Sequence, residues 1–233
     1  MPAARLAPLD RRDPATQPQG VVAGYAQTAQ RWPAEPLVRR PQTPAELSGP
    51  QDLRRRLAPV RGDLAGQGAK RALGQLIHLR ARVVDEDGAP VAGAMVEIWH
   101  CNAAGKYIHP NDSHDAPVDP NFYGAARLVT GDTGLVELRT VKPGAYPVPD
   151  TDGWWRPPHI HFSVFGRVWL SRLVTQMFFP GEPLNESDVI LNAIGDAGAR
   201  NRCIARFVPS RGNALVYEHQ LVVRGRVGTP SLP

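Results

Sequence analysis

Proline is the residue that most restricts what the first quarter of this chain can fold into. Ten of the 24 prolines lie within the first 60 of the 233 residues. Each proline lacks a backbone N–H and fixes its own φ angle, so this spacing excludes a long helix or a central strand. We therefore predict an extended, proline-rich N-terminal arm over residues 1–74. It has no core of its own and lies over its own domain or over a partner chain.

From residue 75 onward the pattern changes to short β-type runs separated by turn residues. Apolar and polar residues alternate over 75–84, as in a half-buried strand, and an acidic turn follows at 85–88. Further strands are expected at 94–100, 135–140, 159–164, 173–179 and 215–224, and short helices at 187–194 and 196–202. This pattern predicts a mainly β fold, a β-sandwich of mixed or antiparallel strands with few short helices, over residues 75–233.

Composition and charge exclude several classes of protein. Hydrophobic residues make up 42% and charged residues 21%, as in soluble globular proteins. No apolar run approaches the roughly 18 residues of a membrane span, and the N-terminus lacks a signal-peptide pattern, so we expect a cytoplasmic protein. The net charge of +5 comes from arginines scattered among acids, which argues against a nucleic-acid interface. A mild positive field would still attract a small anionic substrate.

The chain has two cysteines, Cys101 and Cys203. Two are too few for a cysteine-rich zinc or iron–sulfur site. One disulfide would add little to a domain of this size, so we expect two reduced, buried thiols.

The stretch with the most chemical information is 156–161, which contains a His-X-His pair. Side chains alternate along a strand, so His159 and His161 project to the same face, where both imidazoles can bind one metal ion. The opposite face is apolar and carries Ile160, Phe162 and Val164. The alternative interpretation is one buried structural histidine beside one solvated histidine.

The remaining ligands decide which metal such a pair would bind. A carboxylate would indicate Fe(II) and a third histidine zinc or copper, but neither stands in a partnering motif. We expect His100, His109 and His114 to be solvated loop residues. Two of the five tyrosines, Tyr107 and Tyr146, follow glycine-containing turns that can present a phenol to a cleft. A phenolate is a hard anionic donor that favours Fe(III), which residue chemistry alone leaves as a suggestion.

Together, segments 143–147 and 155–162 resemble the signature of the intradiol ring-cleavage dioxygenases. The spacing Tyr146-x12-His159-x-His161, with Tyr107 a further 39 residues upstream, is similar to that family's four-ligand iron site. The resemblance covers about residues 75–226 and, more loosely, the arm around Tyr25 and Arg31. Its further segments are 91–99, 102–107, 119–122, 173–177 and 222–225.

The resemblance implies a site and a chemistry. It implies one non-haem Fe(III) per chain, with the ligands Tyr107, Tyr146, His159 and His161. Iron would act as Lewis acid and template, and Tyr146, displaced by the diol substrate, would take up a proton. Arg156 is expected to stabilise negative charge developing on the substrate ring, with Gln176 as a neighbouring polar contact.

The resemblance also suggests which residues surround the substrate. Val148 and Ile190 are expected as apolar walls, and Tyr25 and Arg31 as contacts on the substrate's carboxylate side. The sequence departs from the family pattern in two places near this pocket. Val148 stands where the family commonly has tryptophan, and Phe178 where it commonly has tyrosine.

The resemblance is strongest to the two-chain branch of the family, which cleaves protocatechuate to 3-carboxy-cis,cis-muconate in aromatic catabolism. It implies a hetero-oligomer with a homologous α subunit, acting on an aromatic diol and O2. The nearest alternative is a family member acting on catechol or hydroxyquinol. Those enzymes have a long helical N-terminal segment, which this arm cannot form. A non-catalytic transthyretin-like β-sandwich would suit 79–99, but such a module needs no set of two tyrosines and two histidines.

Overall fold

The computed structural model describes the second half of the chain almost completely. The described residues are 13–18, 20–22, 25, 28, 33–35, 60, 62–66, 70–166, 172–210, 212–225 and 227–232. Arg31 and most of the predicted arm therefore lie outside the described residues. Within the described part, no helix has the length and apolar character needed to cross a membrane.

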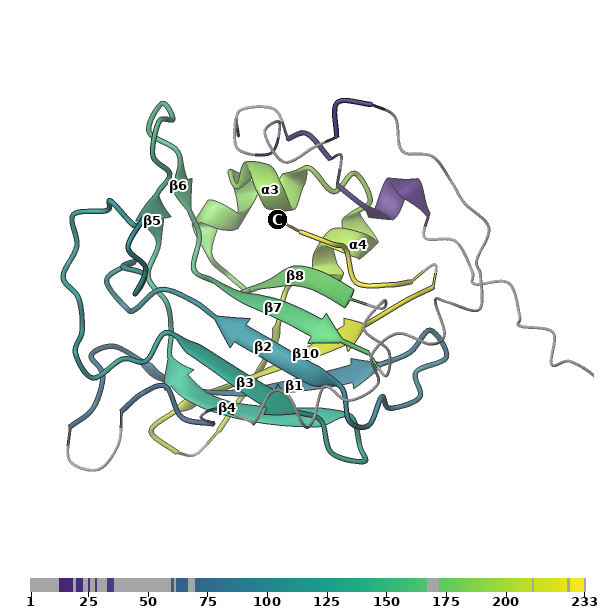
Figure 1. Cartoon of the computed structure of the whole chain (residues 1–233), viewed down its shortest axis with the longest axis horizontal. Helices are drawn as coiled ribbons and strands as arrows, with labels where there is room; N and C mark the ends of the chain where they lie inside the picture. The colour runs from purple at the N-terminus through teal and green to yellow at the C-terminus, as the bar shows by residue number, and fades with distance from the viewer. Residues whose placement is uncertain are drawn as a thin grey trace, which may run out of the picture.

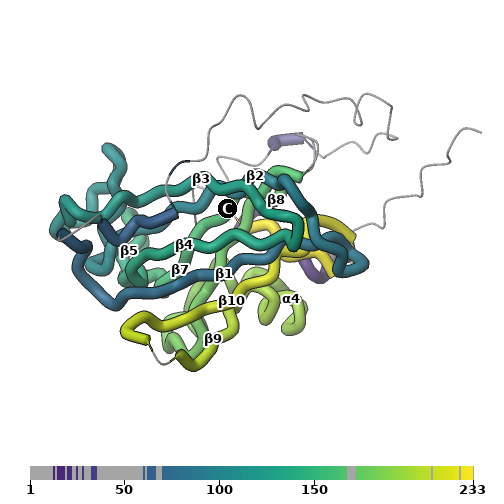
Figure 2. The backbone as a smooth tube through the Cα atoms, turned by 90° about the horizontal axis from the view of Figure 1, so that it is seen from below, coloured from purple at the N-terminus to yellow at the C-terminus, as the bar shows by residue number. Residues whose placement is uncertain are grey.

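Two four-stranded sheets pack against each other, which confirms the predicted β-sandwich (Figure 1). The first sheet has the order β4-β1-β10-β9, with β4 Leu135–Val141, β1 Leu76–Val84, β10 Leu215–Val222 and β9 Arg206–Val208. The second has the order β3-β2-β7-β8, with β3 Ala125–Val129, β2 Met95–Trp99, β7 His159–Phe165 and β8 Arg172–Phe178. β1 and β10 are parallel, and the other strand pairings within these two sheets are antiparallel, so the sandwich is mixed. Figure 2 shows β4, β1 and β10 side by side in the first sheet.

The alternation read from the sequence decides which face of each strand is buried. In β1 the buried residues Ile77 and Leu79 alternate with the exposed His78 and Arg80. In β7 the inward residues are fully buried, as expected: Ile160, Phe162 and Val164. Burying each such side chain contributes about 1.5–3 kcal/mol, so these two faces account for much of the core.

Four short strands were not predicted. They are β3, β9 and the two strands of a ribbon, β5 Tyr146–Pro147 and β6 Trp155–Arg156. β5 and β6 have two residues each, too few to show a period, and β3 contains two alanines and an arginine. These strands form because partners in the sheet supply their hydrogen bonds, a non-local cause.

The two predicted helices are confirmed with shorter bounds. α3 spans Val189–Asn192 and α4 spans Ala197–Arg202, capped by Asp188 and Asp196 respectively. They lie above β8 in Figure 1. Two 3₁₀ turns, η1 Pro14–Thr16 and η3 Pro183–Glu186, accompany them.

One described part of the predicted arm packs into the sandwich. Leu64 and Ala65 are buried within the main core cluster. Isolated bridges join Val60 to Arg127 and Asp63 to Arg139. This segment therefore lies over its own domain, whereas the division of the chain at residue 74 stays a prediction.

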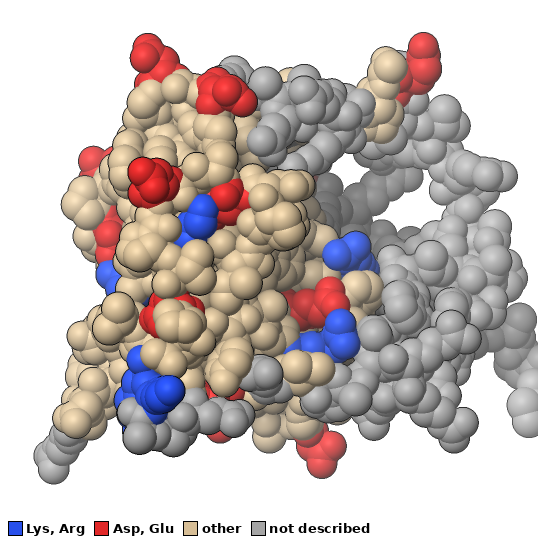
Figure 3. All heavy atoms as spheres, turned by 60° about the vertical axis from the view of Figure 1, so that its left-hand side comes forward, with Lys and Arg blue, Asp and Glu red and all other residues tan. Residues whose placement is uncertain are grey.

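The cysteines and the surface charge agree with the sequence analysis where the structure describes them. Cys101 and Cys203 are both buried and free, as predicted. On the face shown in Figure 3, basic and acidic side chains are interspersed over a mostly uncharged surface.

Candidate metal centre

The two histidines of the His-X-His pair face away from the core. His159 and His161 are the first and third residues of β7, and their Nε2 atoms lie 3.2 Å apart. Trp99 pairs with His161 in register from the neighbouring strand β2 and stacks on its ring, with centroids 4.9 Å apart. The side-chain alternation that buries Ile160 therefore brings two nitrogen donors together on the outer face of the sheet.

The two tyrosines are presented by turns that pack against each other. Gly105 adopts a φ of 81°, and a Cβ there would lie 2.3 Å from the carbonyl oxygen of Ala145. A Cβ on Gly144 would lie 2.5 Å from the carbonyl oxygen of Ala103. Both positions require glycine because the two backbones approach so closely. As a result the rings of Tyr107 and Tyr146 meet edge to face, with centroids 5.4 Å apart.

All four predicted ligands converge. Tyr107 Oη lies 3.2 Å from His161 Nε2, and Tyr146 Oη lies 3.4 Å from His159 Nε2. Among the described residues, no group of three or more His, Cys, Asp or Glu side chains is arranged to hold a metal. The carboxylate and three-histidine alternatives thus find no counterpart in the part of the chain that the structure describes.

The protonation states of this cluster suit a cation. The Nδ1 atom of His159 lies 2.7 Å from the Pro157 carbonyl oxygen, to which it can only donate, so the neutral ring has its lone pair on Nε2. Burial, with the charge of Arg156 and the neighbouring His161, lowers the pKa of His159 well below its usual value. The ring is therefore neutral at pH 7, and Tyr146 Oη and His161 Nε2 lie 3.4 and 3.2 Å from its Nε2 atom.

The raised pKa values of the two phenols limit which cations can bind here. Burial raises the pKa of Tyr146, and it raises the pKa of Tyr107 well above its usual range. Both phenols stay protonated unless a highly charged cation binds the phenolates directly. Two phenol oxygens with two neutral imidazoles therefore fit a hard ferric ion better than a soft one.

Arg156 lies beside this cluster, as predicted. It ends β6, is only 4% exposed, and its Nη1 atom lies 3.2 Å from His159 Nε2. Its Nη2 atom donates to Gln176 Oε1 at 2.8 Å, and Gln176 is fully buried opposite His161 in β8. A buried guanidinium therefore faces the site with a second predicted residue bound to it.

Asp188 is a site residue that the sequence analysis missed. It is fully buried and accepts hydrogen bonds from Arg156 Nε at 2.9 Å and Arg156 Nη2 at 3.2 Å. Its position before α3 is the available sequence signal, since aspartate is a preferred N-cap. Asp188 and Arg156 are 32 residues apart, so no local sequence pattern predicts that they pair.

Asp112 was also missed. Its Oδ2 accepts from the backbone N–H of Tyr107 at 2.7 Å, and Lys106 Nζ lies 3.5 Å from its Oδ1. Lys106 also donates to the backbone carbonyl of His114 at 2.6 Å. These contacts hold the loop that presents Tyr107, and irregular loop contacts have no periodic sequence signal.

Of the predicted substrate-binding residues, the structure describes Tyr25, Val148 and Ile190, and Arg31 is outside the described residues. Phe178 lies 5.7 Å from the His159 ring and packs in one buried cluster with Ile190. Val148 is buried on the ribbon, where its N–H donates to the Trp154 carbonyl. Tyr25 meets the Trp154 ring edge to face at 5.5 Å. Tyr25 therefore contacts Trp154, whose ring lies 5.9 Å from the guanidinium carbon of Arg156.

The expectation that His100 is a solvated loop residue was wrong. His100 is 1% exposed, its Nδ1 lies 2.7 Å from the Cys101 carbonyl, and its Nε2 lies 2.9 Å from Thr140 Oγ1. Burial lowers its pKa to about 4. It lies directly after β2, where two polar partners from the fold satisfy a buried ring. His109 is exposed, as expected, and His114 is half-buried.

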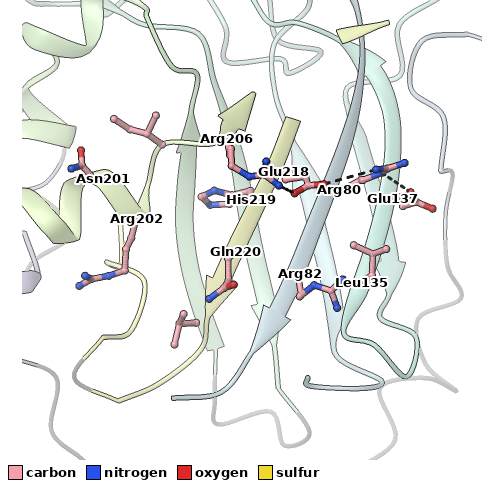
Figure 4. A pocket seen from close by; sticks show the side chains of 12 residues that line it. Arg80, Arg82, Leu135, Glu137, Asn201, Arg202, Arg206, Glu218, His219 and Gln220 are labelled. Atoms are coloured by element: carbon pink, nitrogen blue, oxygen red, sulfur yellow. Dashed lines mark hydrogen bonds and ion pairs between the residues drawn. The ribbon is translucent and has the colours of Figure 1, made fainter. Parts of the chain in front are cut away.

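A large hollow lies elsewhere, on the outer face of the first sheet (Figure 4). Its volume is about 640 Å³, and it shares no residue with the tyrosine–histidine cluster. Arg80 pairs there with Glu137 and with Glu218, and Arg206 pairs with Glu218 (Figure 4). Arg82 and Arg202 also line the hollow, so its four arginines outnumber its two glutamates.

Comparison with known proteins agrees with the fold. Residues 47–225 match the family described as Dioxygenase. The chain therefore belongs to this family, that of the intradiol dioxygenases. Enzymes of this family generally use non-haem iron.

One relative matches along nearly its whole length. The chain is 43% identical over 231 residues to the protocatechuate 3,4-dioxygenase beta chain of Burkholderia cepacia, covering 95% of this chain and 96% of that one. It is 33% identical to hydroxyquinol 1,2-dioxygenase of a Rhizobium strain, over 50% of this chain and 42% of that protein. Among solved structures, chlorocatechol 1,2-dioxygenase from Pseudomonas putida superposes with a TM-score of 0.51 at 27% identity, over 70% of this chain and 65% of that one.

Proposed function

We propose that this protein is the iron-carrying subunit of a protocatechuate 3,4-dioxygenase. It would open the ring of protocatechuate between the two hydroxyl-bearing carbons, adding both atoms of O2 to give 3-carboxy-cis,cis-muconate. The observation that carries the proposal is the convergence of Tyr107, Tyr146, His159 and His161, with neighbouring donor atoms 3.2–3.4 Å apart. The full-length likeness to a protocatechuate 3,4-dioxygenase beta chain supports the choice of substrate.

When bound, ferric iron supplies Lewis-acid activation of the diol and a template for its two oxygens. Tyr146 would accept a proton from one substrate hydroxyl as its phenolate, and its Oη lies 3.4 Å from His159 Nε2 within the cluster.

Arg156 supplies the fixed positive charge. Its Nη1 points at the cluster while Nε and Nη2 are bound to other groups. A preorganised guanidinium in a dry site stabilises negative charge that develops on the substrate ring. Gln176 helps to orient it, and Ile190 and Val148 form apolar walls for the ring.

The substrate's carboxylate needs partners of its own on the side away from the iron. A buried carboxylate is costly without cationic or hydrogen-bonding groups, and Arg156 already has a carboxylate partner in Asp188. We assign this role to Tyr25, to Arg31 and to a homologous α subunit that completes the pocket.

The test is turnover by the iron-loaded protein purified with its partner chain. We expect equimolar consumption of protocatechuate and O2, with a product whose mass is that of protocatechuate plus O2. Catechol and hydroxyquinol serve as comparison substrates, and His161→Ala serves as the inactive control. Efficient turnover of catechol with none of protocatechuate would overturn the choice of substrate and favour the catechol-cleaving alternative.

A further inference from the structure

Asp188 makes two kinds of contact near the candidate metal centre that the proposed reaction does not use. Its Oδ2 accepts from Arg156 Nε at 2.9 Å, and its Oδ1 accepts from Arg156 Nη2 at 3.2 Å. The same Oδ1 accepts from the backbone N–H of Leu191 at 2.7 Å and so caps α3. One fully buried carboxylate thus binds both the guanidinium and the helix that carries Ile190.

The hydrogen bonds of Arg156 leave one direction open. A guanidinium has five N–H donors in a rigid plane. Asp188 takes the edge formed by Nε and Nη2, and Gln176 Oε1 takes the other proton of Nη2 at 2.8 Å. The Trp154 and Phe178 rings lie 5.9 Å from the guanidinium carbon. Nη1 is left to point at His159 Nε2, 3.2 Å away.

The charge of Asp188 matters as much as its geometry. Arg156 is a buried cation next to a site that suits another cation, and the two repel each other strongly where water is excluded. A buried charge that loses its partner is strongly destabilising, whereas a two-point carboxylate pair both neutralises and orients it. Asp188 therefore meets both requirements for keeping a guanidinium beside a metal.

We propose that Asp188 is a positioning residue: it fixes Arg156 Nη1 toward the reacting face of the substrate and ties that orientation to the apolar wall on α3. This inference rests on the proposed function, since it assigns Arg156 a role in ring cleavage. Asp188 touches neither the substrate nor the cluster of tyrosines and histidines, and acts through Arg156.

The informative variant is Asp188→Asn, and the chain offers a matched control. Asparagine keeps an oxygen for the Leu191 N–H, but it removes the charge and presents an N–H₂ group to Arg156. Asp196 caps α4 in the same way, accepting from the Ala199 N–H at 2.6 Å, and it is exposed and takes no part in the site. Asp196→Asn therefore controls for the capping chemistry alone.

Two measurements on the iron-loaded protein with its partner chain distinguish a positioning role of Asp188 from a general loss of structure in the variant. The first is anaerobic titration with protocatechuate, followed by the visible spectrum. The second is the single-turnover rate constant after mixing the bound complex with O2. We expect Asp188→Asn to bind protocatechuate within about threefold of wild type but to react at least about tenfold more slowly, as when one preorganised donor to a developing charge is lost. Asp196→Asn should match wild type in both.

A double-mutant cycle tests whether the effect passes through Arg156. In the Arg156→Met background, adding Asp188→Asn should slow the reaction by less than about twofold, because residues that act as one unit are not additive. Equal rate losses in the two backgrounds would overturn the proposal. So would a single-turnover rate for Asp188→Asn equal to that of Asp196→Asn.

If Asp188→Asn does not yield folded protein, Asp188→Glu takes its place. Glutamate keeps the charge but displaces the carboxylate by one methylene, so we expect unchanged binding and a slower reaction. A wild-type rate in Asp188→Glu would contradict the inference. Failure of the wild-type protein itself to bind protocatechuate would instead contradict the proposed function.

Discussion

The Nε2 atoms of His159 and His161 lie 3.2 Å apart on the outer face of β7, while Ile160 between them is fully buried in the core. The alternation of side chains along β7 therefore has two consequences. Its inner face stabilises the sandwich, and its outer face presents two neutral imidazoles to the two tyrosines. Tyr107 and Tyr146 come from turns that bring their backbones into contact, so the geometry of the cluster depends on the fold as a whole.

Removing one histidine of the cluster should remove the metal. We expect His161→Ala to retain less than about a tenth of the wild-type iron, since changes around a metal site typically cost 10–100-fold in affinity. The matched control is His109→Ala, because His109 is exposed and lies outside the cluster. Iron per chain, measured by elemental analysis, checks this. Similar iron contents in the two variants would contradict the assignment of the strand face.

Adding a methyl group where the turns that present Tyr107 and Tyr146 touch should push the two tyrosines apart. In Gly144→Ala the new Cβ would lie 2.5 Å from the Ala103 carbonyl oxygen and 2.8 Å from the Gly105 nitrogen. We expect a loss of roughly 1–3 kcal/mol in the free energy of unfolding, together with lower iron content. Gly131→Ala is the control, since nothing lies within 4 Å of its added Cβ. Denaturant unfolding of the two variants measures the difference, and equal stabilities would contradict the packing described.

A buried histidine in the core should make stability depend on pH. Burial lowers the pKa of His219 from 6.5 to about 4. Between these values the unfolded chain binds the proton more readily, so the stabilisation is complete above pH 6.5 and is lost as the pH falls. The loss from His219 between pH 7 and pH 5 is about 2 kcal/mol. Unfolding curves of His219→Leu should show a shallower pH slope than wild type, and parallel slopes would be inconsistent with this account.

The chain expressed without a partner should be a poor catalyst. The carboxylate of protocatechuate needs groups that this chain supplies incompletely, and Arg156 is bound by Asp188 and Gln176. Apolar side chains such as Val118, Ile108 and Trp155 are 61%, 54% and 45% exposed, a surface that favours association. We expect low turnover of protocatechuate and aggregation, both corrected by co-expression with the homologous α subunit. A soluble, fully active homo-oligomer would contradict the two-chain proposal.

The sequence predicted those features that depend on local pattern. The strands β1 and β7 and the shared face of His159 and His161 follow from alternation with period two. Asp188 and Arg156 could not be paired in advance, because 32 residues and several turns separate them. His100 was misjudged for a related reason, since its burial depends on Thr140 from the other sheet. The family resemblance supplied the ligand role of Tyr107 and Tyr146, which spacing alone had only suggested.

The most direct test of the central claim is the visible spectrum of the purified protein together with its metal content. A ferric ion bound by the phenolates of Tyr107 and Tyr146 absorbs visible light through charge transfer from phenolate to iron. We predict a red-brown protein with one iron per chain, and loss of both colour and iron in His161→Ala. A colourless protein containing stoichiometric zinc and no iron would contradict the account.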